Sequence, residues 1–277
     1  MKKIEISFTH KDGTVDGIYL NAGDGKPLII IINGHNGFYN YGMFPYIQQS
    51  LAVHGVSSYS FNFSHGGIQG DSDYFDDLKR YEKNCMRLEI EDVMCVLHNL
   101  TSEKFGQPGS AFLLAHSLGG VPEIYSAVNA LDENIAINGI ILISTVKQLN
   151  FWPDEMMEEW KQNKVFYKKN NRTKQLLPQG EEFLSEILKS GTDWNVEKEI
   201  KKLKMPILIV HGDDDEAIPV EHGMKLFEWI KNNNKNASLE IIPGATHTFN
   251  TKHPFEGPSP QLEKMLRVVV PFIQNNQ

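Results

Sequence analysis

The sequence around one serine, Ser117, is typical of a position that holds a reactive hydroxyl. Ser117 follows an apolar run at residues 110–115 and is flanked, two positions to either side, by the small residues Ala115 and Gly119. A strand that turns sharply into a helix lifts the middle residue onto a strained, exposed corner, where only small neighbours fit. The N-terminus of the next helix then favours negative charge near that hydroxyl. The pattern indicates a nucleophile, although a serine that merely caps the helix is the alternative.

Acids and a histidine follow further along the chain, each just after a predicted strand. The three acids at residues 213–215 lie in a polar loop after the apolar run at 206–211, and His247 lies in the loop after 238–242. Because parallel strands end at one edge of a sheet, these side chains are expected to meet Ser117 there. A serine activated by a histidine that an acid orients can attack an acyl carbon.

Metal binding is not predicted for this chain. A run of adjacent acids is usually a solvated loop, and residues 213–215 lack the spaced oxygen ligands and the turn glycine of a calcium loop. None of the histidines has metal-ligand spacing. Of the histidines next to the motifs, His116 is expected to point away from Ser117, and His211 is expected to pack at the end of its strand.

The strands and helices that must position these residues alternate along the chain. Two opening strands followed by strand–helix alternation predict an α/β fold, with an eight-strand, mostly parallel sheet and helices on both faces. Crossovers between parallel strands are expected to be right-handed. The strands are predicted near 3–9, 17–22, 27–33, 57–63, 110–115, 139–144, 206–211 and 238–242, and the helices near 42–53, 81–101, 120–130, 221–232 and 259–274.

Together these motifs resemble the α/β-hydrolase superfamily over nearly the whole chain. The strand, turn and helix around Ser117 are similar to its nucleophile elbow, and the order Ser117, Asp215, His247 is that of its catalytic triad. Residues 211–219 read His-Gly-x-x-Asp-x-x-Ile-Pro and are similar to its acid loop, which favours Asp215 over Asp214. The narrower resemblance is to its serine esterase branch, with feruloyl-esterase-like and dienelactone-hydrolase-like members.

The resemblance also implies an oxyanion hole. Residues 33–38 form a glycine-bounded loop after a buried run and are similar to the His-Gly-x-x-Gly loop of the family, with Asn33 in place of the histidine. The implied donors are the backbone N–H groups of His35 and Leu118, which keep their geometry whatever the side chain. The replacement at Asn33 leaves the hydrogen bonding of the loop itself open. No cofactor is implied.

The segment from Lys147 to Lys204 breaks the alternation, and the resemblance implies a helical cap inserted after strand 6. It shows no convincing strand and predicts short amphipathic helices near 154–163, 179–190 and 196–203. Residues 1–146 and 205–277 then form the α/β-hydrolase core, and 147–204 the cap. Some apolar cap residues either line an acyl pocket or attach the cap to the core. They are Trp152, Met156, Met157, Trp160, Phe166 and Tyr167.

The function that the resemblance implies is that of a carboxylic ester hydrolase acting on a small or medium acyl substrate, with Ser117, Asp215 and His247 as the triad. Because one fold hosts several reactions, three alternatives stay open. They are a peptidase or amidase of the prolyl-oligopeptidase type, an acyltransferase, and a non-catalytic ligand-binding protein. A serine nucleophile argues against the dehalogenase branch, which attacks with an aspartate.

Composition restricts partners and location. The net charge of −8 argues against binding to nucleic acid or to an anionic membrane surface. The first residues show no signal peptide, and no apolar run is long enough to cross a membrane. Cys85 and Cys95 lie too far apart on one predicted helix to pair, which fits a reducing compartment. We therefore expect a cytoplasmic enzyme, monomer or homodimer, whose partner is a small-molecule ester.

Overall fold

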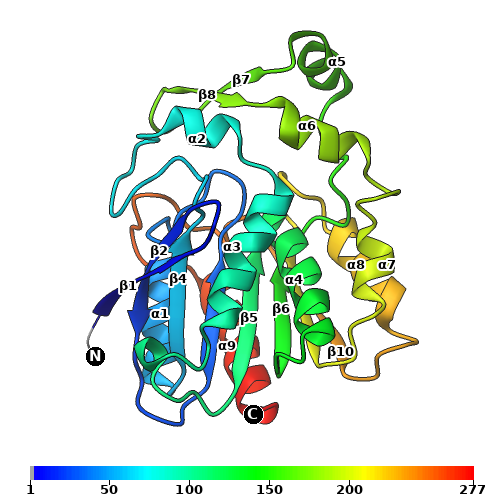
Figure 1. Ribbon diagram of the computed structural model, residues 1–277. Coiled ribbons are helices and arrows are strands. Elements are labelled where there is room, and N and C mark those ends of the chain that lie inside the picture. Colours follow the sequence, from blue (N-terminus) through cyan, green and yellow to red (C-terminus); the bar gives the residue numbers. More distant parts are fainter. Residues whose placement is uncertain (1–2) are drawn as a thin grey trace.

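The computed structural model describes residues 3–277 and has one large sheet (Figure 1). Its strands are β1 (Lys3–Thr9), β2 (Thr14–Leu20), β3 (Leu28–Ile32), β4 (Ser57–Asn62), β5 (Ala111–His116), β6 (Gly139–Ile143), β9 (Ile207–Gly212) and β10 (Ala237–Ile242). They form an eight-stranded sheet in the order β1-β2-β4-β3-β5-β6-β9-β10. Strand β2 pairs antiparallel with both neighbours, and the other pairs are parallel. The predicted eight-strand, mostly parallel sheet is confirmed.

Burial along the strands follows their place in the sheet. The central strands β3, β5 and β6 are buried at every residue, as expected for parallel strands that helices cover on both faces. The edge strand β1 instead buries Ile6 and Phe8 and exposes the alternate residues Glu5, Ser7 and Thr9. The continuous apolar runs therefore mark the centre of the sheet, which is where Ser117 follows β5.

Helices cover both faces of the sheet, as predicted. One face packs against α3 (Met86–His98), α4 (Gly120–Asp132) and α8 (Glu221–Ile230), and the other against α1 (Phe44–Val53) and α9 (Pro260–Asn275) (Figure 1). Alternate residues of β5 enter the two cores, Leu113 on the first face and Leu114 on the second. No helix within residues 3–277 is long and apolar enough to span a membrane.

Two element boundaries differ from the prediction. Strand β2 begins at Thr14 and not near residue 17, because its register with β1 brings Thr14 opposite Thr9 across a tight hairpin. The helix predicted over 81–101 is two helices, α2 (Leu78–Glu82) and α3. Asp77 caps the start of α2 by accepting a hydrogen bond from the Arg80 backbone N–H, and the extended backbone at Cys85 separates α2 from α3.

Residues 147–204 leave the sheet after β6 and return to it at β9. They contain α5 (Asp154–Asn163), β7 (Phe166–Lys169), β8 (Leu176–Gln179), α6 (Glu181–Leu188) and α7 (Val196–Ile200). Figure 1 shows α5, β7, β8 and α6 beyond one end of the sheet, together with α2, whereas α7 packs lower down against α4 and α8.

The helices of this segment are close to those predicted, but the absence of strands was wrong. Strands β7 and β8 pair antiparallel as a separate two-stranded sheet. Each is only four residues long, β7 is largely exposed, and β8 contains Pro178, which normally argues against a strand. The pattern of apolar residues was therefore too short and too interrupted to predict this hairpin.

Candidate active site

Ser117 occupies a strained corner between β5 and α4. It is the first residue of a single 3₁₀ turn, Ser117–Gly119, and its φ is 58°. An L-residue held at positive φ is uncommon and costs energy, so the surrounding packing must enforce it. A Cβ atom on Gly119 would lie 2.4 Å from the Asn33 carbonyl oxygen, and one on Gly120 would lie 2.1 Å from the Thr145 methyl group. The small residues beside Ser117 are therefore sterically required.

The structure brings the three predicted catalytic side chains together. His247 Nε2 lies 3.0 Å from Ser117 Oγ, and His247 Nδ1 lies 2.9 Å and 3.1 Å from the two carboxylate oxygens of Asp215. Asp213 and Asp214 are exposed, and Asp213 instead accepts a hydrogen bond from the Gly244 backbone N–H. Asp215 is thus the acid that contacts the histidine.

Asp215 is held as a carboxylate by its surroundings. Its side chain has no solvent exposure, and Oδ1 accepts hydrogen bonds from the backbone N–H groups of Ala217 and Ile218. Burial acts to raise the pKa of Asp215, but hydrogen bonds from His211 and His247 outweigh it and lower the pKa below its usual value. A charged Asp215 fixes the imidazole with its proton on Nδ1 and leaves Nε2 to accept from Ser117.

The loop proposed to form the oxyanion hole packs directly against Ser117. Gly37 N–H donates to the Gly34 carbonyl in a tight turn, with Asn36 at a φ of 62°. A Cβ atom on Gly34 would lie 2.9 Å from Ser117 Cβ, so the loop backbone approaches this closely only because Gly34 is glycine. Asn33 Nδ2 donates to the Phe61 carbonyl at 2.7 Å, which ties the loop to the end of β4.

The two predicted oxyanion donors belong to two backbone segments next to Ser117. Leu118 is the second residue of a helical turn, where backbone N–H groups have no acceptor within the helix. His35 belongs to the turn that contacts Ser117, and both His35 and Ser117 line one cavity. Two separate backbone segments thus adjoin Ser117, an arrangement in which N–H groups can stabilise an oxyanion.

This cavity has a volume of about 260 Å³. That is below the range of roughly 300–1,000 Å³ for pockets that hold drug-sized ligands. The walls come from the Gly34 loop, the Ser117 turn, the His247 loop and the turn between β7 and β8. The lining residues are Gly34, His35, Asn36, Gly37, Tyr41, Phe44, His116, Ser117, Asn170, Asn171, Arg172, His247 and Thr248.

The apolar residues of segment 147–204 that the sequence left between two roles do not line this cavity, and most of them pack in the core. Trp160 is fully buried and packs edge-to-face on Trp152 and near Phe166, while Tyr167 is 58% exposed. Phe183 joins the same cluster. The cavity lining contains none of the six aromatic and methionine residues, and segment 147–204 contributes the polar residues 170–172 instead.

The prediction for His116 was wrong. Its side chain turns toward the site, where Nε2 donates to the His247 carbonyl oxygen at 2.9 Å and the two rings lie 4.6 Å apart. Burial, reinforced by His247, lowers the pKa of His116 to about 3, so the ring stays neutral. His116 thereby fixes the loop that carries His247. His211 packs as predicted, with Nε2 donating to the Ile218 carbonyl of the acid loop.

A second layer of polar side chains supports the Gly34 loop from behind and was not predicted. Gln179 of β8 is hydrogen-bonded to the His35 ring, and Tyr81 of α2 donates to Asn36 Oδ1. Burial, with a smaller contribution from the charge of Lys168, lowers the pKa of His35 to about 3. The His35 side chain is therefore a neutral packing group, and both α2 and the β7–β8 hairpin contact the loop.

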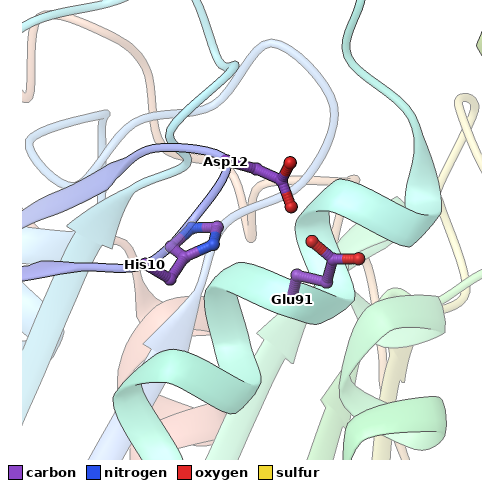
Figure 2. Close-up of side chains that lie close together, drawn as sticks. All are labelled: His10, Asp12 and Glu91. Carbon is purple, nitrogen blue, oxygen red and sulfur yellow. The ribbon is translucent and has the colours of Figure 1, made fainter.

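Three possible metal ligands lie together outside this cavity. His10, Asp12 and Glu91 bring their side chains within reach of one ion, at the β1–β2 turn and on α3 (Figure 2). Each member also has a partner of opposite charge: His10 contacts Asp92 at 2.6 Å, Arg87 contacts Glu91 at 2.6 Å, and Lys11 lies 3.8 Å from Asp12. The sequence did not indicate this grouping because its members come from separate elements.

Comparison with solved structures supports the fold. Est1E from Butyrivibrio proteoclasticus, with ferulic acid bound, superposes with a TM-score of 0.72 at 20% identity and 98% coverage of both chains. The dienelactone hydrolase of Anabaena variabilis superposes with a TM-score of 0.66 at 12% identity, covering 99% of this chain and 98% of its own. At these identities the likeness establishes architecture.

Sequence comparison gives a partial family match. Residues 191–272 match the dienelactone hydrolase family. The acylamino-acid-releasing enzyme of Mus musculus is 24% identical over 173 residues, which is 58% of this chain. The chain spans only 21% of the length of that relative. The sheet topology, the strained serine turn and the structural likeness together show an α/β-hydrolase fold, and residues 191–272 are similar in sequence to the dienelactone hydrolase family.

Proposed function

We propose that the protein is a serine hydrolase that cleaves a carboxylic ester of a small or medium acyl group through an acyl-enzyme. The main support is the continuous series of contacts from Asp215 through His247 to Ser117. His247 Nδ1 lies 2.9 Å from Asp215 Oδ2, and His247 Nε2 lies 3.0 Å from Ser117 Oγ. A serine that only caps a helix needs neither partner. The series matches the geometry that activates a serine hydroxyl for attack on a carbonyl.

In the proposed first step, Ser117 Oγ attacks the ester carbonyl and His247 Nε2 accepts its proton. Asp215 keeps the imidazole oriented and stabilises its positive charge without taking the proton. The carbonyl oxygen becomes negative and accepts hydrogen bonds from the backbone N–H groups of His35 and Leu118. His247 then gives the proton to the departing alkoxide, which leaves as an alcohol.

In the second step, His247 removes a proton from water, and the resulting hydroxide attacks the acyl-enzyme carbonyl. The tetrahedral intermediate collapses, Ser117 recovers its proton from His247, and the acid is released. The segment 147–204 is proposed to act as a cap in both steps, since its turn at residues 170–172 forms one wall of the cavity. The small cavity favours short acyl groups.

Amide hydrolysis is the second candidate. It is favoured by the likeness of 58% of this chain to the acylamino-acid-releasing enzyme of Mus musculus. The same triad serves both reactions, so ester and amide hydrolysis differ in the group that leaves, an alcohol or an amine. An aminoacyl p-nitroanilide assayed beside the esters separates the two candidates by their relative kcat/KM.

The test of the proposed function is hydrolysis of p-nitrophenyl esters from acetate to decanoate. Because the cavity holds about 260 Å³, we expect acetate or butyrate to exceed decanoate in kcat/KM by about tenfold or more, as small differences in fit to a pocket allow. An optimum at decanoate would contradict the assignment of the cavity. A protein that turns over no ester and does cleave the anilide would favour the amidase.

A further inference from the structure

The wall that the cap contributes to the Ser117 cavity carries a fixed positive charge. Among the lining residues that the structure describes, Arg172 is the one with a permanent charge, and none is Asp or Glu. The protein as a whole has a net charge of −8, which on its own would repel anionic substrates. A lone arginine inside this cavity is therefore a local exception to the charge of the molecule.

The position of Arg172 is set by its own turn and by the core. Asn170 Oδ1 accepts hydrogen bonds from the backbone N–H groups of Arg172, at 2.9 Å, and Thr173, at 3.0 Å, which shapes the turn between β7 and β8. The guanidinium carbon lies 5.0 Å from the centre of the Phe38 ring, a stacking arrangement typical of arginine. The charged group is thus held in place before any substrate binds.

The guanidinium is only partly satisfied by the protein. Nη1 donates to the Asp73 backbone carbonyl, whereas the Asp73 carboxylate lies 3.9 Å away and is hydrogen-bonded to His253. Nη2 is shielded from solvent and has no hydrogen-bond partner within residues 3–277. An unpaired donor on a charged group costs free energy, and an acceptor reaches Nη2 after a small movement of the Arg172 side chain.

We propose that Arg172 binds a carboxylate on the substrate, so that the preferred esters carry a second, anionic group close to the scissile bond. A carboxylate is planar and accepts the forked N–H groups of a guanidinium. Arg172 and Ser117 line the same cavity of about 260 Å³, so its size limits how far the anion can lie from the reacting carbonyl. This inference rests on the proposed serine hydrolase function and makes it more specific.

The experiment compares matched charged and neutral esters. For an anion on the acyl side, mono-p-nitrophenyl glutarate is compared with p-nitrophenyl pentanoate; for an anion on the alcohol side, 4-acetoxybenzoate is compared with its methyl ester. The readout is the ratio of kcat/KM within each pair. We expect the native protein to favour the anionic member of at least one pair. The responding pair identifies the side that carries the anion.

Arg172→Met should reduce this ratio by about 10- to 100-fold, the range for loss of a hydrogen bond to a charged group. Lys169→Met is the matched control, because Lys169 is exposed on the same hairpin. This variant loses one positive charge, as Arg172→Met does, and its ratio of kcat/KM should stay at the native value. If Arg172→Met does not fold, the native ratio is measured from low to about 0.5 M salt, where screening should lower it.

Two results would overturn the inference. One is a native protein that favours the anionic member of neither pair, and the other is a ratio unchanged in folded Arg172→Met. Either result leaves the proposed function intact provided that the neutral esters are hydrolysed. Failure to hydrolyse any of the four esters would instead count against the ester hydrolase itself.

Discussion

Replacing Ser117 with alanine is expected to lower kcat for ester hydrolysis by a factor on the order of 10⁵–10⁶, as loss of the nucleophile does in serine hydrolases. The hydroxyl is the atom that bonds to the acyl group, and nothing else in the turn replaces it at 3.0 Å from His247 Nε2. Alanine keeps the Cβ atom and accepts the same backbone position, so the fold should persist. Steady-state kinetics together with circular dichroism check both parts.

The control for this substitution is Ser126→Ala. Ser126 lies on α4, is fully buried, and its hydroxyl has no hydrogen-bond partner in the described part of the chain. Removing that hydroxyl should leave hydrolysis unchanged, which separates loss of the nucleophile from a general effect of serine removal in this helix–turn region. A Ser117→Ala protein that retains most of its activity would mean that another residue attacks the ester.

The second large effect is expected at the acid. Asp215→Asn should lower kcat by about 10⁴-fold, since an amide no longer selects the imidazole tautomer that accepts the serine proton. Asp214→Asn removes the same charge one residue away, on an exposed side chain, and should change kcat by less than about threefold because solvent screens it. Kinetics of the two variants at one pH decide between the acids, and a larger loss for Asp214→Asn would contradict the assignment.

Asp215 should also matter for stability in acid. Its pKa is lowered on folding because hydrogen bonds from His211 and His247 outweigh the effect of burial. A lowered carboxylate pKa adds stability that is fully present above the unfolded value, about 3.9, and is lost as pH falls through the folded value. The native protein should therefore lose stability below about pH 4 more steeply than Asp215→Asn.

The parts of the molecule predictable from the sequence are those that local patterns determine. Fully apolar runs such as residues 28–32 and 111–116 are buried on both faces of the sheet, and their lengths match strands. The loops after β5, β9 and β10 carry Ser117, Asp215 and His247. Because these parallel strands end at one edge of the sheet, sequence order was enough to bring the three side chains together.

The parts that could not be predicted depend on contacts between distant segments. Gln179 meets His35 and Arg172 meets Phe38 only because the β7–β8 hairpin folds over the Gly34 loop, across more than 130 positions of sequence. Nothing in the four-residue strands of that hairpin indicates such a partner. The prediction for His116 failed for a related reason, since its hydrogen-bond partner, the His247 carbonyl, lies 131 positions away in the sequence.

The most direct test of the central claim is to locate the nucleophile chemically. The protein is treated with a fluorophosphonate, which reacts covalently with an activated serine, and the modified peptide is identified by mass spectrometry. The account predicts one adduct per chain, on Ser117, with parallel loss of ester hydrolysis and no adduct on Ser117→Ala. An adduct on a different residue, or full hydrolysis by protein that is not modified at Ser117, would contradict it.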